Sequence, residues 1–143
     1  MTLLITEDAM TYSRSLTHAD DAHEALRQLA HTTRRIEDPT TIYPMLGELS
    51  AALNDLAQAL HQIAGVHDAQ VTQQVTVGGD HRAGRAASYQ VAWDLHRAAE
   101  MLGQIAGGID QAHQIEAQIT YDIRPTPSLE AVPQCDRDTG MSL

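Results

Sequence analysis

One apolar repeat constrains the fold of this chain more than any other feature. Between residues 91 and 119, apolar residues recur at alternating steps of four and three, and only Glu116 interrupts the series. A stripe kept at this heptad spacing predicts one long α-helix whose apolar side must be covered by another helix. The stripe consists of Val91, Leu95, Ala98, Leu102, Ile105, Ile109, Ala112 and Ile119.

A second region upstream has the same pattern. Residues 41–69 carry apolar side chains at steps of three and four with polar residues between them, which predicts another long helix. Gly78-Gly79 is the clearest turn signal, and Asp80 is placed to cap a third helix over residues 81–121. Two such helices joined by a short connection form an antiparallel hairpin. The upstream stripe consists of Ile42, Met45, Leu46, Leu49, Leu53, Leu56, Leu60, Ile63 and Val66.

A shorter helix is predicted over residues 18–36. Thr17 and Asp20 resemble a capping box in which Asp replaces Glu, and Pro39 prevents the helix from continuing. We expect this helix to pack along the groove of the hairpin. The predicted fold is therefore all-α, an elongated three-helix bundle built on a long antiparallel helical hairpin.

The 143 residues suit a single domain. We expect the helical bundle to occupy residues 17–122. Residues 1–16 form an N-terminal arm, either a short strand-like segment or an added helical turn. Residues 123–143 contain Pro and polar residues and are expected to form a flexible tail.

The two long stripes also predict self-association. Their far ends leave apolar area that one short helix does not cover, and a second copy of the chain would close it. We therefore expect a homo-oligomer.

The charge balance excludes one class of function. The formal net charge is −10, and the basic residues do not cluster into a basic face. Proteins that bind phosphate backbones need such a face, so direct binding of nucleic acid is not expected.

The location is expected to be the cytoplasm. The single cysteine, Cys135, excludes an internal disulfide and suits a reducing compartment. Glu7 and Asp8 follow Met1 too closely for a signal-peptide core, and no apolar run is long enough to span a membrane. No membrane partner is expected.

A small aromatic cluster is the best candidate for a binding surface. At 100° per residue, Trp93 lies almost opposite the stripe of its helix, and Tyr89 and His96 share its side. Large aromatic residues on such a face often mark a contact with a partner. Two alternatives remain, a second core covered by the first helix or the N-terminal arm, and a ligand pocket.

The eight histidines invite a metal or haem site, but their pattern does not favour one. Asp20-x-x-His23 and Asp110-x-x-His113 each place a carboxylate and an imidazole on one helical face. Ferritin-like sites use Glu-x-x-His together with further inward Glu residues, which are missing here. For haem, the pattern allows His67 to face inward, whereas His61 and His31 point outward. No catalytic motif occurs either, so we expect no cofactor, no metal and no enzymatic activity.

Several short segments resemble small helical proteins of actinobacterial genomes, some of them encoded near mobile-element genes. That group has no assigned activity, so the resemblance implies a bacterial cytoplasmic setting and no catalytic residues. It covers about residues 20–119 and rests on Asp38-Pro39, Tyr43-Pro-Met-Leu-Gly-Glu-Leu49, Leu95-His-Arg-Ala-Ala99 and Ile109-Asp-Gln-Ala-His-Gln114.

These observations favour a non-catalytic protein–protein interaction or scaffold subunit that acts through helix faces. The first alternative is an acidic, antitoxin-like inhibitor of a basic partner, and the second is a metal- or haem-binding bundle. The predicted contact surface is Tyr89, Trp93 and His96. The predicted helix–helix seam is Leu49, Leu53, Leu56, Leu60, Val91, Leu95, Leu102, Ile105 and Ile109.

The contact surface makes a direct prediction. Trp93→Ala should leave helical content intact and weaken self-association or partner binding, because the ring is expected to lie outside the seam. Circular dichroism and light scattering measure the two quantities. A variant that loses its helices would place Trp93 in the core and contradict the contact-surface hypothesis.

Overall fold

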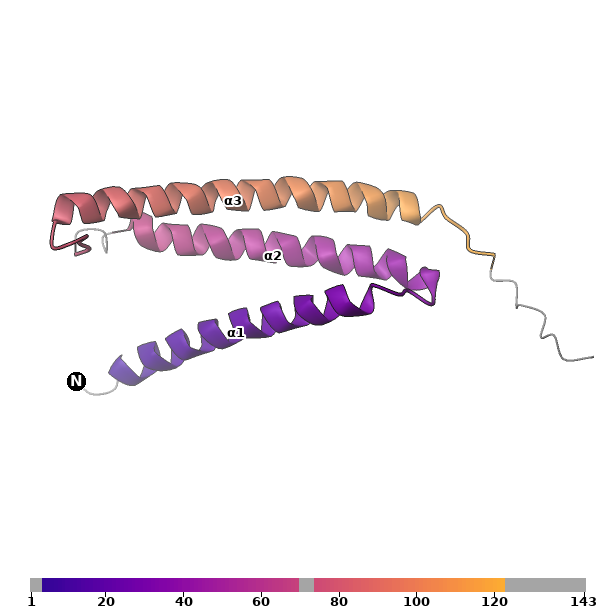
Figure 1. Ribbon diagram of the computed structural model, residues 1–143, viewed down its shortest axis with the longest axis horizontal. Coiled ribbons are helices and arrows are strands. Elements are labelled where there is room, and N and C mark those ends of the chain that lie inside the picture. Colours follow the sequence, from indigo (N-terminus) through magenta and orange to yellow (C-terminus); the bar gives the residue numbers. More distant parts are fainter. Residues whose placement is uncertain (1–3, 70–73, 123–143) are drawn as a thin grey trace, which may run out of the picture.

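The computed structural model describes residues 4–69 and 74–122, with side chains from Arg14 onward, and this part of the chain is all-α (Figure 1). No strand occurs in these ranges. The predicted all-α class, the three helices and the long antiparallel hairpin are confirmed. The elements in chain order are α1 (Leu4–Thr32), the 3-10 turn η1 (Pro39–Thr41), α2 (Ile42–Asp68) and α3 (His81–Glu116).

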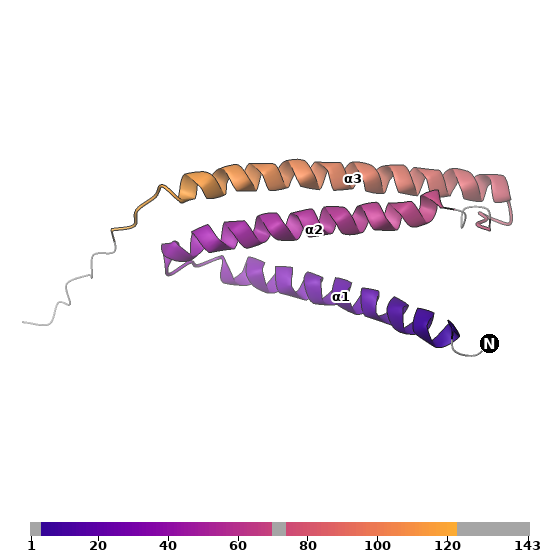
Figure 2. The same ribbon diagram turned by 180° about the vertical axis from the view of Figure 1, so that it is seen from behind.

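Small side chains form the contact line between α2 and α3. On each helix these residues recur at steps of seven, so they stay on one side of a helix that follows the heptad repeat. They are at most 9% exposed. Because small side chains let two backbones approach closely, this line brings α2 and α3 side by side over their length (Figures 1 and 2). The line consists of Ser50, Ala57 and Ala64 on α2, and Ala92, Ala99 and Ala106 on α3.

Polar contacts define the register of the hairpin. Near one end, the Tyr43 ring stacks on His113 with 4.1 Å between ring centroids. Near the other end, Ser88 Oγ donates to the carbonyl oxygen of His67 over 3.3 Å and lies 3.0 Å from its Nδ1. Each contact joins residues that the antiparallel heptad register places opposite one another.

The connection before α3 follows the sequence prediction. Gly78 and Gly79 have φ values of 58° and 85°, in the left-handed region that glycine adopts without steric cost. The carboxylate of Asp80 accepts hydrogen bonds from the backbone N–H groups of Arg82 (2.7 Å) and Ala83 (3.3 Å). The predicted turn and the predicted N-cap are both confirmed. The alternating segment from Val71 lies partly outside the described residues.

The first helix differs from the prediction at both ends. α1 begins at Leu4, so residues 4–16 follow the helical alternative for this segment, over more than the one added turn, and not the strand-like one. Thr17 lies inside the helix, so the predicted capping box at its start is wrong. α1 ends at Thr32 instead of residue 36. In the last turn the Leu29 carbonyl oxygen accepts from both the backbone N–H (3.0 Å) and the hydroxyl (2.8 Å) of Thr33. The next N–H groups, of Arg34 and Arg35, bond to carbonyls three residues back, so the α-helical pattern stops there.

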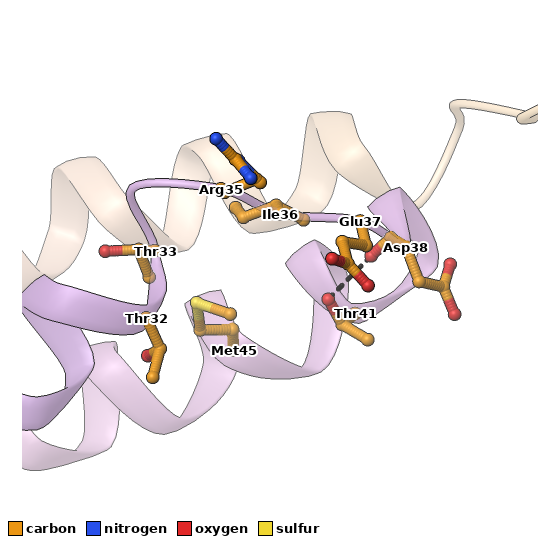
Figure 3. Close-up of a pocket in the computed structure, with 8 residues that line it drawn as sticks. All are labelled: Thr32, Thr33, Arg35, Ile36, Glu37, Asp38, Thr41 and Met45. Atoms are coloured by element: carbon orange, nitrogen blue, oxygen red, sulfur yellow. Dashed lines mark hydrogen bonds between the residues drawn. The ribbon is translucent and has the colours of Figure 1, made fainter.

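The connector between α1 and α2 is organised by Asp38. Its carboxylate accepts from the backbone N–H of Thr40 (2.9 Å) and from the Thr40 hydroxyl (2.6 Å), which together lower the pKa of Asp38. The Thr41 hydroxyl donates to the Asp38 carbonyl oxygen (Figure 3). A shallow hollow opens between this connector and the start of α2. Its lining is Thr32, Thr33, Arg35, Ile36, Glu37, Asp38, Thr41 and Met45 (Figure 3).

The expected packing of the first helix in the hairpin groove is wrong. In the described ranges, α1 packs against neither α2 nor α3, and it diverges from the hairpin towards its N-terminus (Figures 1 and 2). Leu16 and Leu26 are 64% and 52% exposed. From Arg14 to Thr32, α1 contains only three large aliphatic residues, namely these two and Leu29. So few side chains bury little apolar area to offset the entropy of ordering a helix against its neighbours.

The small contact line can be tested with Ala99→Leu. Ala99 is 2% exposed, so the larger side chain must push α2 and α3 apart, and we expect a loss of about 1–3 kcal/mol of unfolding free energy. Ala86→Leu on the exposed side of α3 is the matched control and should change stability by less than about 0.5 kcal/mol. Denaturant unfolding at one protein concentration measures both. Equal effects would contradict the contact line.

A pair of glycine substitutions tests the packing of the connector. A Cβ on Gly84 would lie 2.2 Å from the Val75 carbonyl oxygen, so Gly84→Ala must displace backbone and destabilise the protein. A Cβ on Gly103 would meet nothing within 4 Å, so Gly103→Ala should stabilise α3 by about 0.5–1 kcal/mol. Thermal unfolding distinguishes the two. Stabilisation by Gly84→Ala would show that the connector does not lie over α3.

Candidate interaction surfaces

The hairpin has two unlike sides, which a pair of histidines identifies. His61 follows Ala57 by four residues, and His96 precedes Ala99 by three. Their Nδ1 atoms are 2.8 Å apart, so these two heptad positions share one side of the hairpin. Helix rotation places Leu60 on the opposite side of the contact line.

Aliphatic residues occupy that opposite side, here called the apolar face. It includes all nine residues of the predicted seam, together with Ile63. Most of the predicted seam is half-buried, whereas Leu56, Val91 and Ile105 are 44%, 40% and 51% exposed. The residues of the apolar face are Leu49, Leu53, Leu56, Leu60 and Ile63 on α2, and Val91, Leu95, Leu102, Ile105 and Ile109 on α3.

The predicted seam therefore lies beside the contact line instead of on it. The buried residue is Ala57 where the stripe names Leu56, and Ala106 where it names Ile105. The sequence signal for the true line is the exact seven-residue repeat of Ser or Ala. The heptad stripe follows the largest aliphatic residues, so it does not identify this line.

A hydrogen-bonded cluster lies on the polar side. His96 Nε2 is 2.9 Å from Asp68 Oδ2, and its Nδ1 faces Nδ1 of His61. A carboxylate only accepts, so Nε2 of His96 carries a proton. In neutral His96 the Nδ1 atom then accepts from Nδ1–H of His61. His61 is exposed, as expected, and its contact with His96 joins α2 to α3 at positions that the heptad register brings together.

The predicted contact residues lie at the edge of this polar side. Tyr89 and Trp93 are 60% and 56% exposed. The Arg97 guanidinium lies over the Trp93 ring at 5.4 Å from its centroid, a cation–π contact. His96 belongs to the cluster with His61. Since α1 packs against neither hairpin helix, the first helix does not cover these aromatic residues as a second core.

Glu116, which interrupts the stripe, is the last residue of α3. The Tyr121 hydroxyl donates to its carboxylate, and this hydrogen bond raises the pKa of Tyr121, with a smaller contribution from burial. α3 ends at Glu116, five residues earlier than the predicted end at Tyr121. A shallow hollow beside Tyr43 includes both residues.

The histidines of the metal hypothesis are dispersed. His113 stacks on Tyr43, and His67 is bonded to Ser88. His23 lies on exposed α1. Across residues 14–69 and 74–122, no three His, Cys, Asp or Glu side chains are grouped to hold one metal ion.

Comparisons with known proteins find no relative of this chain. No family model, no functionally curated protein and no solved structure matches this chain. The resemblance to small helical actinobacterial proteins stays a prediction. No helix in the described part of the chain has an apolar stretch sufficient to cross a membrane.

Proposed function

We propose that this chain is a non-catalytic interaction protein that binds a protein partner through the helix faces of its hairpin. The observation that carries the proposal is the apolar face, on which large aliphatic side chains from both helices stay exposed. Soluble proteins rarely leave such contiguous apolar surface uncovered unless it binds something.

The chemistry of the face defines the class of partner. On the apolar side of the contact line, the two heptad positions next to it hold no Asp, Glu or Arg from Ile42 to His67 on α2 or from Ser88 to Ala112 on α3. Nucleic acid would require a basic surface, which this face does not have. An amphipathic helix or helical pair, whose own apolar side fits between α2 and α3, matches it.

The aromatic surface of Tyr89, Trp93 and His96 provides a second contact region. It lies on the other side of the contact line, so it can be occupied together with the apolar face. This arrangement supports a scaffold or accessory role. We place the protein in the cytoplasm, in keeping with its single cysteine.

Site-specific photo-crosslinking tests the proposal in intact cells. Benzoylphenylalanine in place of Ile63, which is 50% exposed on the apolar face, should give a discrete adduct of higher mass after irradiation. The same probe in place of the neighbouring Gln62 lies on the far side of α2 and should give none. Adducts are detected by gel shift and mass spectrometry. Absence of any intermolecular adduct from Ile63 would contradict the proposed function.

A further inference from the structure

The proposed function leaves open what covers the apolar face. Resting on that function, we propose that the occupant is a second copy of this chain. Two hairpins pack apolar face against apolar face about a two-fold axis, and α2 and α3 of both copies form a four-helix core.

The alternation of residue sizes points to four helices. On α3 the core positions follow steps of three and four through Ala92, Leu95, Ala99, Leu102 and Ala106. The alanines are buried by α2, but the leucines between them are only half-buried. Within one hairpin, therefore, only the small residues of the heptad pattern are fully buried. A further pair of helices is needed to bury the leucines. α2 repeats the arrangement with Ser50, Leu53, Ala57, Leu60 and Ala64.

The positions next to these leucines are also aliphatic. In a two-stranded coiled coil the flanking positions are usually charged and face water. Here they hold Leu56 and Ile63 on α2 and Val91 and Ile105 on α3, each at least 40% exposed. Aliphatic residues at flanking positions suit a core in which every helix contacts two neighbours.

The absence of charge on the apolar face is compatible with the same face of a second copy. A protein with a formal net charge of −10 repels itself unless its charges point away from the interface. The apolar face is neutral, and acidic residues such as Glu48, Asp55 and Glu100 lie on other sides of the helices. A two-fold axis pairs a neutral face with itself, so every contact is repeated by symmetry. A partner that is recognised by charge would find no counter-charge here.

The exposed area is large enough for such an interface. The chain exposes 12551 Å², against about 7200 Å² for a compact monomer of 15.6 kDa. When the 28 residues outside the described ranges are allotted about 160 Å² each, the other 115 residues expose about 8100 Å², against about 6200 Å² for a compact domain of that size, which is an excess of about 1900 Å². Part of this excess belongs to the detached α1. A standard interface needs only about 800 Å² from each partner.

Helix α1 of the same chain is the competing occupant, and it fits less well. Its described side chains include three large aliphatic residues, against ten on the apolar face, and five charged residues, Arg14, Asp20, Asp21, Glu24 and Arg27. The Glu24 carboxylate already accepts from Arg27 on the surface of α1 at 2.8 Å. A second hairpin offers a matching set of aliphatic residues. The second copy does not contact Trp93, so the aromatic surface stays available to another partner.

Light scattering behind size exclusion tests the proposal on the full chain at a low and a high concentration. The expected mass is twice 15.6 kDa. Ile63→Glu and Ile105→Glu place a charge on exposed positions of the face and should halve the measured mass. The controls Gln62→Glu and Gln104→Glu add the same charge to the adjacent, outward residue and should keep the mass of the parent. Circular dichroism verifies that all four variants remain helical.

The outcomes separate this inference from the proposed function. A parent mass of 15.6 kDa at both concentrations, or a halved mass in the control variants, overturns the second copy. If Ile63→Glu loses its helices, the photo-crosslink from position 63 identifies what covers the apolar face instead. An adduct of twice the chain mass supports the second copy, and an adduct with a different protein overturns it while the docking surface stands. No adduct overturns both proposals.

Discussion

The close contact of α2 with α3 along a line of small residues is the constraint on which the rest of the structure depends. Ser and Ala at seven-residue steps leave no room for large side chains between the two helices. The leucines and isoleucines of both stripes are therefore displaced to one side of the line. His61, His96, Asp68, Tyr89 and Trp93 are displaced to the other. The apolar face and the polar side of the hairpin thus have one cause, the close packing of α2 against α3 along the small residues.

This division gives the molecule its chemical character. The polar side is internally satisfied, with His96 bonded to both His61 and Asp68. The apolar face has no comparable set of partners within the described chain, because α1 diverges from the hairpin. Small residues occupy the contact line and leucines occupy the apolar face beside it. Burying these leucines completely, and gaining the corresponding free energy, therefore requires further helices. The proposed association follows from this distribution of small and large residues.

Much of the candidate site was predictable, but its arrangement was not. The heptad pattern predicts that Leu95 and Leu102 face other helices, and in the structure both are half-buried beside the contact line, whereas Trp93 is exposed. It did not show that Ala99, and not a leucine, meets α2. Periodicity reports the direction of the mean apolar side of a helix, whereas the contact line depends on which side chains allow the closest approach. The pairing of His61 with His96 likewise depends on the antiparallel register of two helices.

The sequence by itself determined the local structure of this protein: the helical state, the Gly78-Gly79 turn and the Asp80 cap follow from propensity, φ preference and side-chain hydrogen bonding within a few residues. It also determined that α2 and α3 return on one another, because their stripes are similar and their connection is short. Only the tertiary structure decided which half of each stripe is buried, and that α1 is detached. Both depend on how well distant surfaces fit and on how much apolar area each contributes. No local pattern contains that information.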